Sequence, residues 1–265
     1  YDTQGTWTGG NIRNCVGASL LVEQSNLDMD SVEISDGLSG RKIGFAMPSI
    51  GMIAADTSTL TTSNVTIQRV REIGFVQSGS DSTHSNLYIQ DSDWAGVIAL
   101  AGETHAGTLS TGGRTSLIES ARGAGILAVG LQSISLAGLT VDQTRLRPAI
   151  GDAMEIFQIG DGLAFIGIQE EVSLQDVAIT NTPRVGLFLD GGPNGIEPNF
   201  LIENVGIGNP EVEGDYGLVY QNGIDYNPEF DNIVFDTESG PTEDVFGAEN
   251  DANLETPQGV QSFGN

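Results

Sequence analysis

Cysteine and lysine are almost missing from the chain: its 265 residues include one cysteine, Cys15, and one lysine, Lys42. A single cysteine excludes an intrachain disulfide, and a lone free cysteine is typical of a small buried apolar position rather than of a nucleophile. Ten Lys and Arg residues stand against 36 Asp and Glu residues, which gives a net charge of −26. A chain this acidic would repel nucleic acid, so we expect no nucleic-acid partner.

Long apolar runs are also absent, and none reaches the roughly 18 residues that a membrane span needs. We therefore expect no membrane insertion. The chain begins at Tyr1 without a leader of basic and then apolar residues, which indicates a processed or trimmed piece of a longer precursor. Its abundant Gly, Ser, Thr, Asn and Asp with so little lysine make the composition similar to that of secreted bacterial β-proteins. An extracellular or cell-surface location is therefore predicted.

Short alternating apolar segments and glycines dominate the chain, and helical periodicity is absent. Apolar residues alternate at Val65 and Ile67, as on a strand with one buried face, and Gly74 follows nine residues after Val65. The same spacing recurs in Leu87, Ile89 and Gly96, and in Val177, Ile179 and Gly186. A strand, a short polar turn, a glycine and a second strand therefore form a unit that the chain uses repeatedly.

The length of this unit indicates a solenoid. Gly74 and Gly96 are 22 residues apart, and other units are longer because their turns carry insertions. About 22 residues hold three short strands and three turns. The alternative is an antiparallel sandwich or meander, but the Asn-Gly and Asp-Gly hairpin turns that such folds use are largely missing. The insertions also fall at the same turns while the strand pairs stay intact, which favours a parallel stack.

The unit resembles the right-handed single-stranded parallel β-helix of the pectin-lyase-like superfamily, over roughly residues 15–247. The expected fold is an all-β solenoid of about eight coils, with residues 1–247 as the β-helix domain and residues 248–265 as an acidic C-terminal tail or cap. Stacked coils place like residues in ladders. The predicted inner ladders are Val65, Leu87, Leu139 and Val177, with Ile67, Ile89, Val141 and Ile179 beside them.

Eight of the ten basic residues fall in one turn of the unit, and Trp94 takes that turn where no basic residue does. Since the same turn of successive coils stacks, we predict that these residues form a stripe that binds a carboxylated or sulfated polysaccharide. The alternative is a structural ladder, in which the arginines pair with acidic neighbours such as Glu72, Asp91, Asp93, Glu119 and Asp142. The predicted substrate-binding residues are Arg41, Lys42, Arg69, Arg71, Trp94, Arg122, Arg145, Arg147 and Arg184.

The resemblance also implies a chemistry. In polysaccharide lyases of this superfamily, an arginine or lysine abstracts the proton beside a sugar carboxylate, and calcium held by acidic residues neutralises that carboxylate. This makes Arg71, Arg122 and Arg147 the candidate bases, and calcium or another divalent metal the candidate cofactor. The run Arg145–Pro148 is similar to an arginine–proline motif of pectate lyases but lacks its downstream arginine. The paired aspartates and the Gly-His-Gly of polygalacturonases are missing as well.

A second cluster joins Asp81 and His84 to Glu103 and His105. The two histidines follow the glycines of adjacent units by ten and nine residues, so we expect stacked coils to bring them together. Two histidines and two carboxylates suit zinc or a similar ion, or supply a general base. The alternative is an exposed turn with chance stacking, because the local spacing is not that of a zinc site.

Two functions remain open from the sequence. In the first, a secreted or cell-surface β-helix protein binds an anionic polysaccharide along the basic turn, with or without cleaving it. In the second, the chain is a non-catalytic structural or adhesive β-solenoid module, which associates end to end or belongs to a larger parent protein. The one-sided placement of the basic residues favours the first, and the incomplete catalytic signature favours the second.

Overall fold

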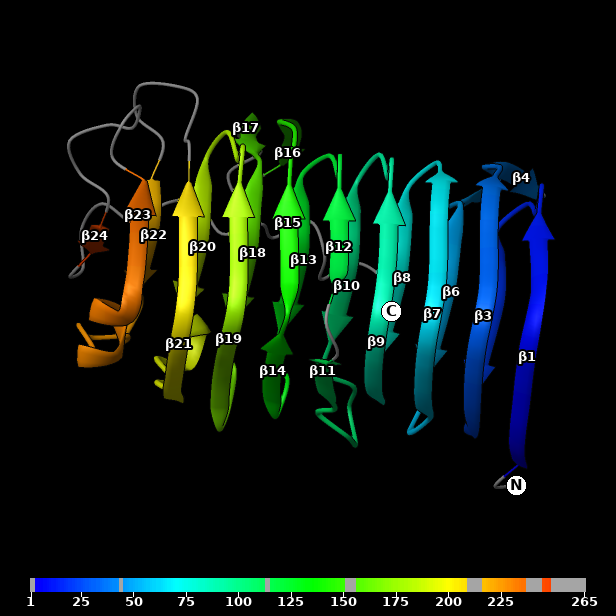
Figure 1. The fold of residues 1–265 in the computed structure, drawn as a ribbon, viewed down its shortest axis with the longest axis horizontal. Helices are drawn as coiled ribbons and strands as arrows, with labels where there is room; N and C mark the ends of the chain where they lie inside the picture. The colour runs from blue at the N-terminus through cyan, green and yellow to red at the C-terminus, as the bar shows by residue number, and fades with distance from the viewer. Residues whose placement is uncertain are drawn as a thin grey trace.

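The computed structural model describes residues 3–42, 45–112, 115–150, 156–208, 216–236 and 245–248. The described chain winds into a solenoid with two stacked sheets, one in front and one behind in Figure 1. All neighbouring strands within each of these two sheets pair in parallel. In Figure 1 the front strands run upward, the back strands run downward and the chain advances from right to left, which makes the coil right-handed. The predicted all-β parallel β-helix is confirmed.

Each coil contributes to both sheets. The front sheet consists of β1 (Thr3–Arg13), β3 (Ser25–Gly37), β7 (Thr59–Val70), β9 (Asp81–Gln90), β11 (Thr108–Gly112), β12 (Ser116–Glu119), β14 (Ser133–Ala137), β15 (Leu139–Asp142), β19 (Glu171–Thr180), β21 (Asn199–Gly208) and β23 (Ile233–Asp236). The back sheet consists of β2 (Ala18–Glu23), β6 (Ile50–Ala55), β8 (Ile73–Ser78), β10 (Ala95–Leu100), β13 (Ala124–Val129), β18 (Asp161–Ile166), β20 (Val185–Asp190), β22 (Tyr216–Gln221) and β24 (Val245–Ala248).

Two antiparallel hairpins interrupt the upper turn that leads from the front sheet to the back sheet. The first is β4 (Gly40–Lys42) with β5 (Phe45–Met47), and the second is β16 (Arg147–Ile150) with β17 (Ile156–Ile159). Both rise at the top of Figure 1. The only helical segments of the described chain are two 3₁₀ turns, η1 (Gly192–Asn194) and η2 (Pro228–Asn232). No helix in this part of the chain has the length and apolarity to span a membrane.

The long front strands bend where one residue adopts a left-handed backbone. Asn64 and Asn86 have φ of 53°, and Asp176 and Asn204 have φ of 52°, a region that Asn and Asp tolerate better than most residues. The side chains at the bend bind one another: Asn86 Nδ2 donates to Asn64 Oδ1 at 3.0 Å, and Asn64 Nδ2 donates to Asp30 Oδ1 at 2.8 Å. This ladder joins consecutive coils at the bend.

The side chains inside the solenoid stack as predicted. All eight residues of the predicted inner ladders are buried, and the parallel register places Val65 opposite Leu87. One coil departs from the pattern, because Ser116 and not Leu117 faces inward there. The Ser116 hydroxyl accepts a hydrogen bond from the backbone N–H of Leu87 at 3.2 Å, which satisfies the polar atom in the core.

The repeated glycine is the second residue of seven back strands, in a column where consecutive coils approach closely. An added Cβ at Gly74 would lie against the Ile89 side chain and 2.6 Å from the carbonyl oxygen of Gly96. No side chain fits there, so the spacing seen in the sequence is a packing requirement. The column contains Gly51, Gly74, Gly96, Gly125, Gly162, Gly186 and Gly217.

The predicted domain boundary lies inside β24, the last described strand, which pairs with β22. Residues 249–265, which make up nearly all of the predicted tail or cap, lie outside the described part of the chain.

Candidate functional site

The upper turn is where the predicted basic residues are found. Arg69 is the next-to-last residue of β7, Arg71 lies between β7 and β8, Arg122 lies between β12 and β13, and Arg184 lies between β19 and β20. Arg145 follows β15, and Arg147 begins hairpin β16–β17. Arg41 and Lys42 belong to β4 of the first hairpin, where the structure describes the backbone and not the surroundings of the side chains.

Two of these arginines form exposed ion pairs with acids of the preceding coils. Arg69 Nε lies 2.7 Å from Asp36 Oδ1, and Arg145 Nη2 lies 3.5 Å from Asp91 Oδ1. The hydrogen bond from Arg69 lowers the pKa of the Asp36 carboxyl from its ordinary value. Exposed pairs of this kind contribute little to stability, but they occupy both guanidinium groups. These contacts follow the structural-ladder alternative.

Arg184 is committed to a buried contact. Its Nε lies 2.9 Å from Oδ1 of Asp161, whose side chain is fully buried at the start of β18. The guanidinium also lies over the ring of Phe188, 5.5 Å from the ring centroid. Burial raises the pKa of Asp161, while the positive charge of Arg184 opposes that rise. Arg184 therefore compensates a buried carboxylate.

The remaining three arginines, Arg71, Arg122 and Arg147, line one groove of about 410 Å³ on the upper turn. They are the three candidate bases of the sequence. Ser39, Glu72 and Asp93 complete the lining. Ser39 directly precedes hairpin β4–β5 and Arg147 begins hairpin β16–β17, so the groove lies along the upper turn between the two insertions. We call it the arginine groove.

Arg147 lines the arginine groove, and two contacts hold its guanidinium group in place. Its guanidinium lies over the ring of Trp94, 5.0 Å from the centroid, and its Nη1 donates to the backbone carbonyl of Asp93 at 3.1 Å. Burial lowers the pKa of Arg147, and the nearby Glu72 carboxylate opposes this effect. Trp94 therefore packs against Arg147, and the ring face that Arg147 covers is not open to stacking with a sugar.

The guanidinium groups of Arg122 and Arg71 differ in the number of hydrogen bonds that they make within the protein. Arg122 Nε donates to the carbonyl of Leu146 at 3.2 Å, which fixes the guanidinium but uses one of its nitrogens. The Arg71 guanidinium has no hydrogen-bond or ion-pair partner among the described residues, although its backbone N–H is bound by Ser49 Oγ. Elsewhere in the lining, the Ser39 hydroxyl donates to Glu72 Oε1 at 3.1 Å. Arg71 and the outer nitrogens of Arg122 are therefore the donors of the groove that remain open to an anion.

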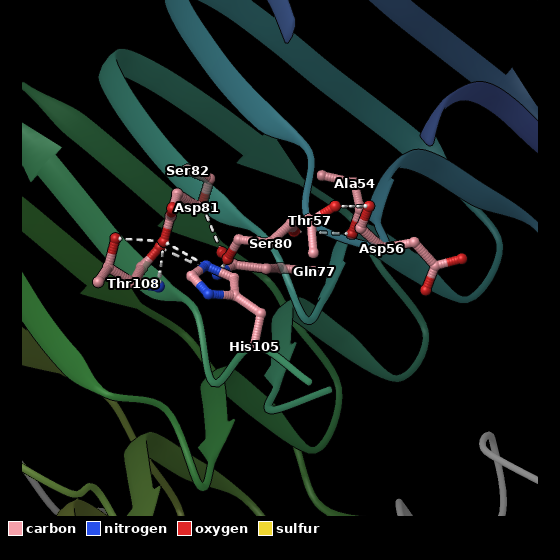
Figure 2. Close-up of polar contacts among 9 residues, drawn as sticks. All are labelled: Ala54, Asp56, Thr57, Gln77, Ser80, Asp81, Ser82, His105 and Thr108. Atoms are coloured by element: carbon pink, nitrogen blue, oxygen red, sulfur yellow. Dashed lines mark hydrogen bonds and ion pairs between the residues drawn. The ribbon is translucent and has the colours of Figure 1, made fainter. Parts of the chain in front are cut away.

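The second predicted cluster lies on the lower turn, at the opposite edge of the sheets. His105 Nε2 lies 3.1 Å from Asp81 Oδ1. The same oxygen accepts hydrogen bonds from the backbone N–H and the hydroxyl of Thr108, both at 2.9 Å, and Figure 2 shows these contacts converging on Asp81. The carboxylate thereby joins the segment between β10 and β11 to the start of β9. Asp81 therefore stabilises the lower turn.

Of the four predicted metal ligands, His84 lies apart, because its side chain turns into the interior of the solenoid. Its side chain is fully buried inside the solenoid, where its ring packs edge-on against Phe75 at 4.8 Å between centroids. Nδ1 shares a 2.7 Å hydrogen bond with Thr62 Oγ1, and Nε2 has no partner. Within the described residues no group of three or more His, Cys, Asp or Glu side chains is placed to hold a metal ion.

Sequence reasoning missed Ser39 as a groove residue and named Glu72 and Asp93 only as charge partners. Ser39 reaches the site because hairpin β4–β5 is inserted directly after it. The available signal was the insertion itself, since long turns beside a regular stack are where sites are built.

Comparisons with known proteins give a likeness of fold only. No protein-family model matches the chain, and no relative is found among curated proteins. A polygalacturonase from Erwinia carotovora ssp. carotovora matches 91% of this chain and 76% of its own, at 11% identity and a TM-score of 0.40. The catalytic domain of a GH87 α-1,3-glucanase in complex with tetrasaccharides matches 93% of this chain and 64% of its own, at 13% identity and a TM-score of 0.37.

Proposed function

We propose that the arginine groove binds a short stretch of an anionic saccharide, through carboxylate or sulfate groups, and that the chain works as a secreted or cell-surface polysaccharide-binding β-helix. The observation that carries the proposal is the concentration of three arginines around one groove in a protein of net charge −26. Cations are rare in this chain, and three of the seven predicted arginines line this one groove.

The donors and the size of the groove fit this ligand class. Arg71 has no side-chain partner in the described structure, and Arg122 keeps its outer nitrogens, so two guanidinium forks are open to bidentate contact with an oxyanion. A volume of about 410 Å³ lies within the range of small-molecule sites. Glu72 and Asp93 on the wall are hydrogen-bond acceptors for sugar hydroxyl groups.

The test is calorimetric titration with oligomers of a uronic acid, of a sulfated sugar and of a neutral sugar of equal length. We expect binding of at least one anionic series and none of the neutral one. Arg71→Ala and Arg122→Ala are each expected to weaken binding by about ten- to a hundredfold, as for a lost hydrogen bond to a charged group. Arg69→Ala is the matched control, because Arg69 is paired with Asp36 outside the groove lining.

Cleavage is assayed in the same samples by the ultraviolet absorbance of an unsaturated product, with and without calcium. Binding without product assigns a binding module, and an unsaturated product assigns a lyase. The absence of binding to every anionic oligomer would overturn the proposal.

The second candidate is a non-catalytic structural rod. The observation that favours it is the pairing of Arg69, Arg145 and Arg184 with acids of other coils. In that case Arg71→Ala and Arg122→Ala leave every binding signal unchanged, and Arg184→Ala lowers stability because Asp161 stays buried without its counter-charge.

A further inference from the structure

The back sheet carries a second apolar surface, on the side that faces away from the interior of the solenoid. Val97 and Ala99 of β10 belong to the main core, while Ile98 between them belongs to a separate apolar cluster. The parallel register continues Ile98 through the following strands as one row. We call this row the outer ladder, and it consists of Ile98, Leu127, Ala164, Phe188 and Val219.

The outer ladder is buried, although it lies outside the solenoid. Its side chains are between 0% and 2% exposed. The outward residues of the front sheet, such as Thr61, Thr83 and Ser135, are polar and exposed, as side chains that face water usually are. A parallel sheet whose strands are apolar on both faces is covered on both faces. The outer face of the back sheet therefore has a cover.

The strands and 3₁₀ turns of the described chain do not supply this cover. The strands of the outer ladder pack against their neighbours in the back sheet and against the strands beside them around the coil. The two hairpins rise at the upper ends of these strands (Figure 1). The guanidinium of Arg184 lies over the ring of Phe188, but one guanidinium cannot cover a ladder that runs from β10 to β22.

Residues 249–265 have the length to cross the whole outer ladder. They follow β24, the last strand of the back sheet, and five strand spacings of about 4.8 Å separate β24 from β10, or about 24 Å. At about 3.3 Å per residue, an extended segment of this length reaches about 55 Å. The other internal stretches outside the described residues are tied at both ends to described strands; they are 43–44, 113–114, 151–155, 209–215 and 237–244.

The composition of residues 249–265 suits an apolar face. The acids Glu249, Asp251 and Glu255 are in the part closer to β24. Residues 256–265 carry no charge, in a chain with 36 Asp and Glu residues, and they include Val260 and Phe263. A neutral segment can cover apolar side chains without the free-energy cost of burying a carboxylate.

We propose that residues 249–265 dock on the outer face of the back sheet, crossing from β24 towards β10 with Val260 and Phe263 packed against the outer ladder. The segment then completes a second, smaller core outside the solenoid. The same cover accounts for the full burial of Asp161, whose partners in register, Ala124 and Val185, belong to the outer apolar cluster.

Hydroxyl-radical footprinting of the full chain, read by mass spectrometry, tests this docking. Phe165 and Phe188 are matched reporters, because both are buried on adjacent strands but Phe165 faces the interior and Phe188 the outer face. In the original chain we expect both to be labelled equally slowly. Val260→Asp together with Phe263→Asp puts carboxylates against the apolar face, so Phe188 should be labelled several-fold faster while Phe165 stays protected.

Gln258→Asp together with Asn265→Asp is the matched control, because it adds the same charge to the segment and keeps both apolar residues. We expect the control to protect Phe188 as the original chain does. Rapid labelling of Phe188 in the original chain, or equal labelling of Phe188 in the two double variants, would overturn the proposal. Two other outcomes would also overturn it: protection that depends on protein concentration, which assigns the cover to a second copy, and a gain of labelling at Phe235 of β23 alone, which assigns the segment to the end of the solenoid.

Discussion

His84 is a titratable group inside the solenoid, and it gives the stability of the molecule a pH dependence. Burial lowers the pKa of its imidazole from 6.5 to about 4. The unfolded chain therefore binds a proton between these values and the folded chain does not, so stability falls as the pH drops below 6.5. We expect urea unfolding to show a loss from this residue of about 2 kcal/mol between pH 6.5 and pH 5.

The comparison that isolates this effect uses His84→Gln, which cannot titrate and retains a polar group beside Thr62. The difference in unfolding free energy between the original chain and His84→Gln should shrink as the pH falls. Only the original chain has an imidazole at position 84, which binds a proton on unfolding and so favours the unfolded state at low pH. His105→Gln serves as the control, since His105 is part of the lower turn and paired with Asp81. Parallel pH curves for the original chain and His84→Gln would refute the assignment.

The position of His84 shows where residue-level prediction reached its limit. Strict alternation from Leu87 and Ile89 makes the residue at 85 an inward one and turns His84 outward, toward the predicted metal site. The left-handed backbone of Asn86 breaks the alternation, so Ser82 and His84 face inward instead. A single polar residue at φ of 53° decided this, and a one-residue change of face reverses every side chain before it.

At the scale of elements, the glycine column makes the sharpest prediction. An added methyl group at Gly125 would press on the Val141 side chain and lie 2.6 Å from the carbonyl oxygen of Gly162. The backbone of the next coil cannot move without disturbing its own pairing. We expect Gly125→Ala to lower the unfolding free energy by about 2–3 kcal/mol in chemical denaturation.

Gly206→Ala is the control for this prediction. Gly206 also lies in a strand, β21, but an added Cβ there meets nothing within 4 Å. A methyl group at this position is expected to be neutral or slightly stabilising, because glycine costs conformational entropy in a strand. If both variants lose equal stability, the close stacking of coils at Gly125 is not the cause.

The strand–glycine–strand unit could be predicted because each of its parts has a strong local cause. Alternating β-branched residues make the half-buried strand, and the close approach of coils admits only glycine. The coil that contains Ser116 was harder, because a serine in the inner ladder hides the alternation and Leu117 offers a false apolar pair. Only the hydrogen bond from Leu87, in the preceding coil, reveals why serine is tolerated.

At the scale of the whole molecule, the arginine groove depends on contacts that no local pattern contains. Ser39 and Arg147 are more than a hundred residues apart in the chain, and two insertions bring them to the same groove. The sequence predicted that the basic residues share one turn of the coil. It could not predict which of them would be neutralised, because that depends on the side-chain directions of acids such as Asp36 and Asp91.

The net charge of −26 leads to a last prediction about the molecule as a whole. A folded rod holds its carboxylates closer together than an unfolded chain does, so their repulsion opposes folding. Salt shortens the screening length from about 10 Å at 0.1 M to about 3 Å at 1 M. We expect the thermal unfolding midpoint to rise by several degrees over this range of NaCl.

Divalent ions separate screening from specific binding in the same experiment. We expect CaCl2 and MgCl2 at equal ionic strength to raise the unfolding midpoint to the same degree, because screening depends on the charge of the ions. A rise with CaCl2 that MgCl2 does not reproduce would mean that calcium has a specific site, because a screening effect depends on charge and not on the size or coordination of the ion.

A midpoint that stays constant or falls with NaCl would show that paired carboxylates such as Asp36 and Asp161 already offset the repulsion, since salt weakens attractive pairs as well as repulsive ones.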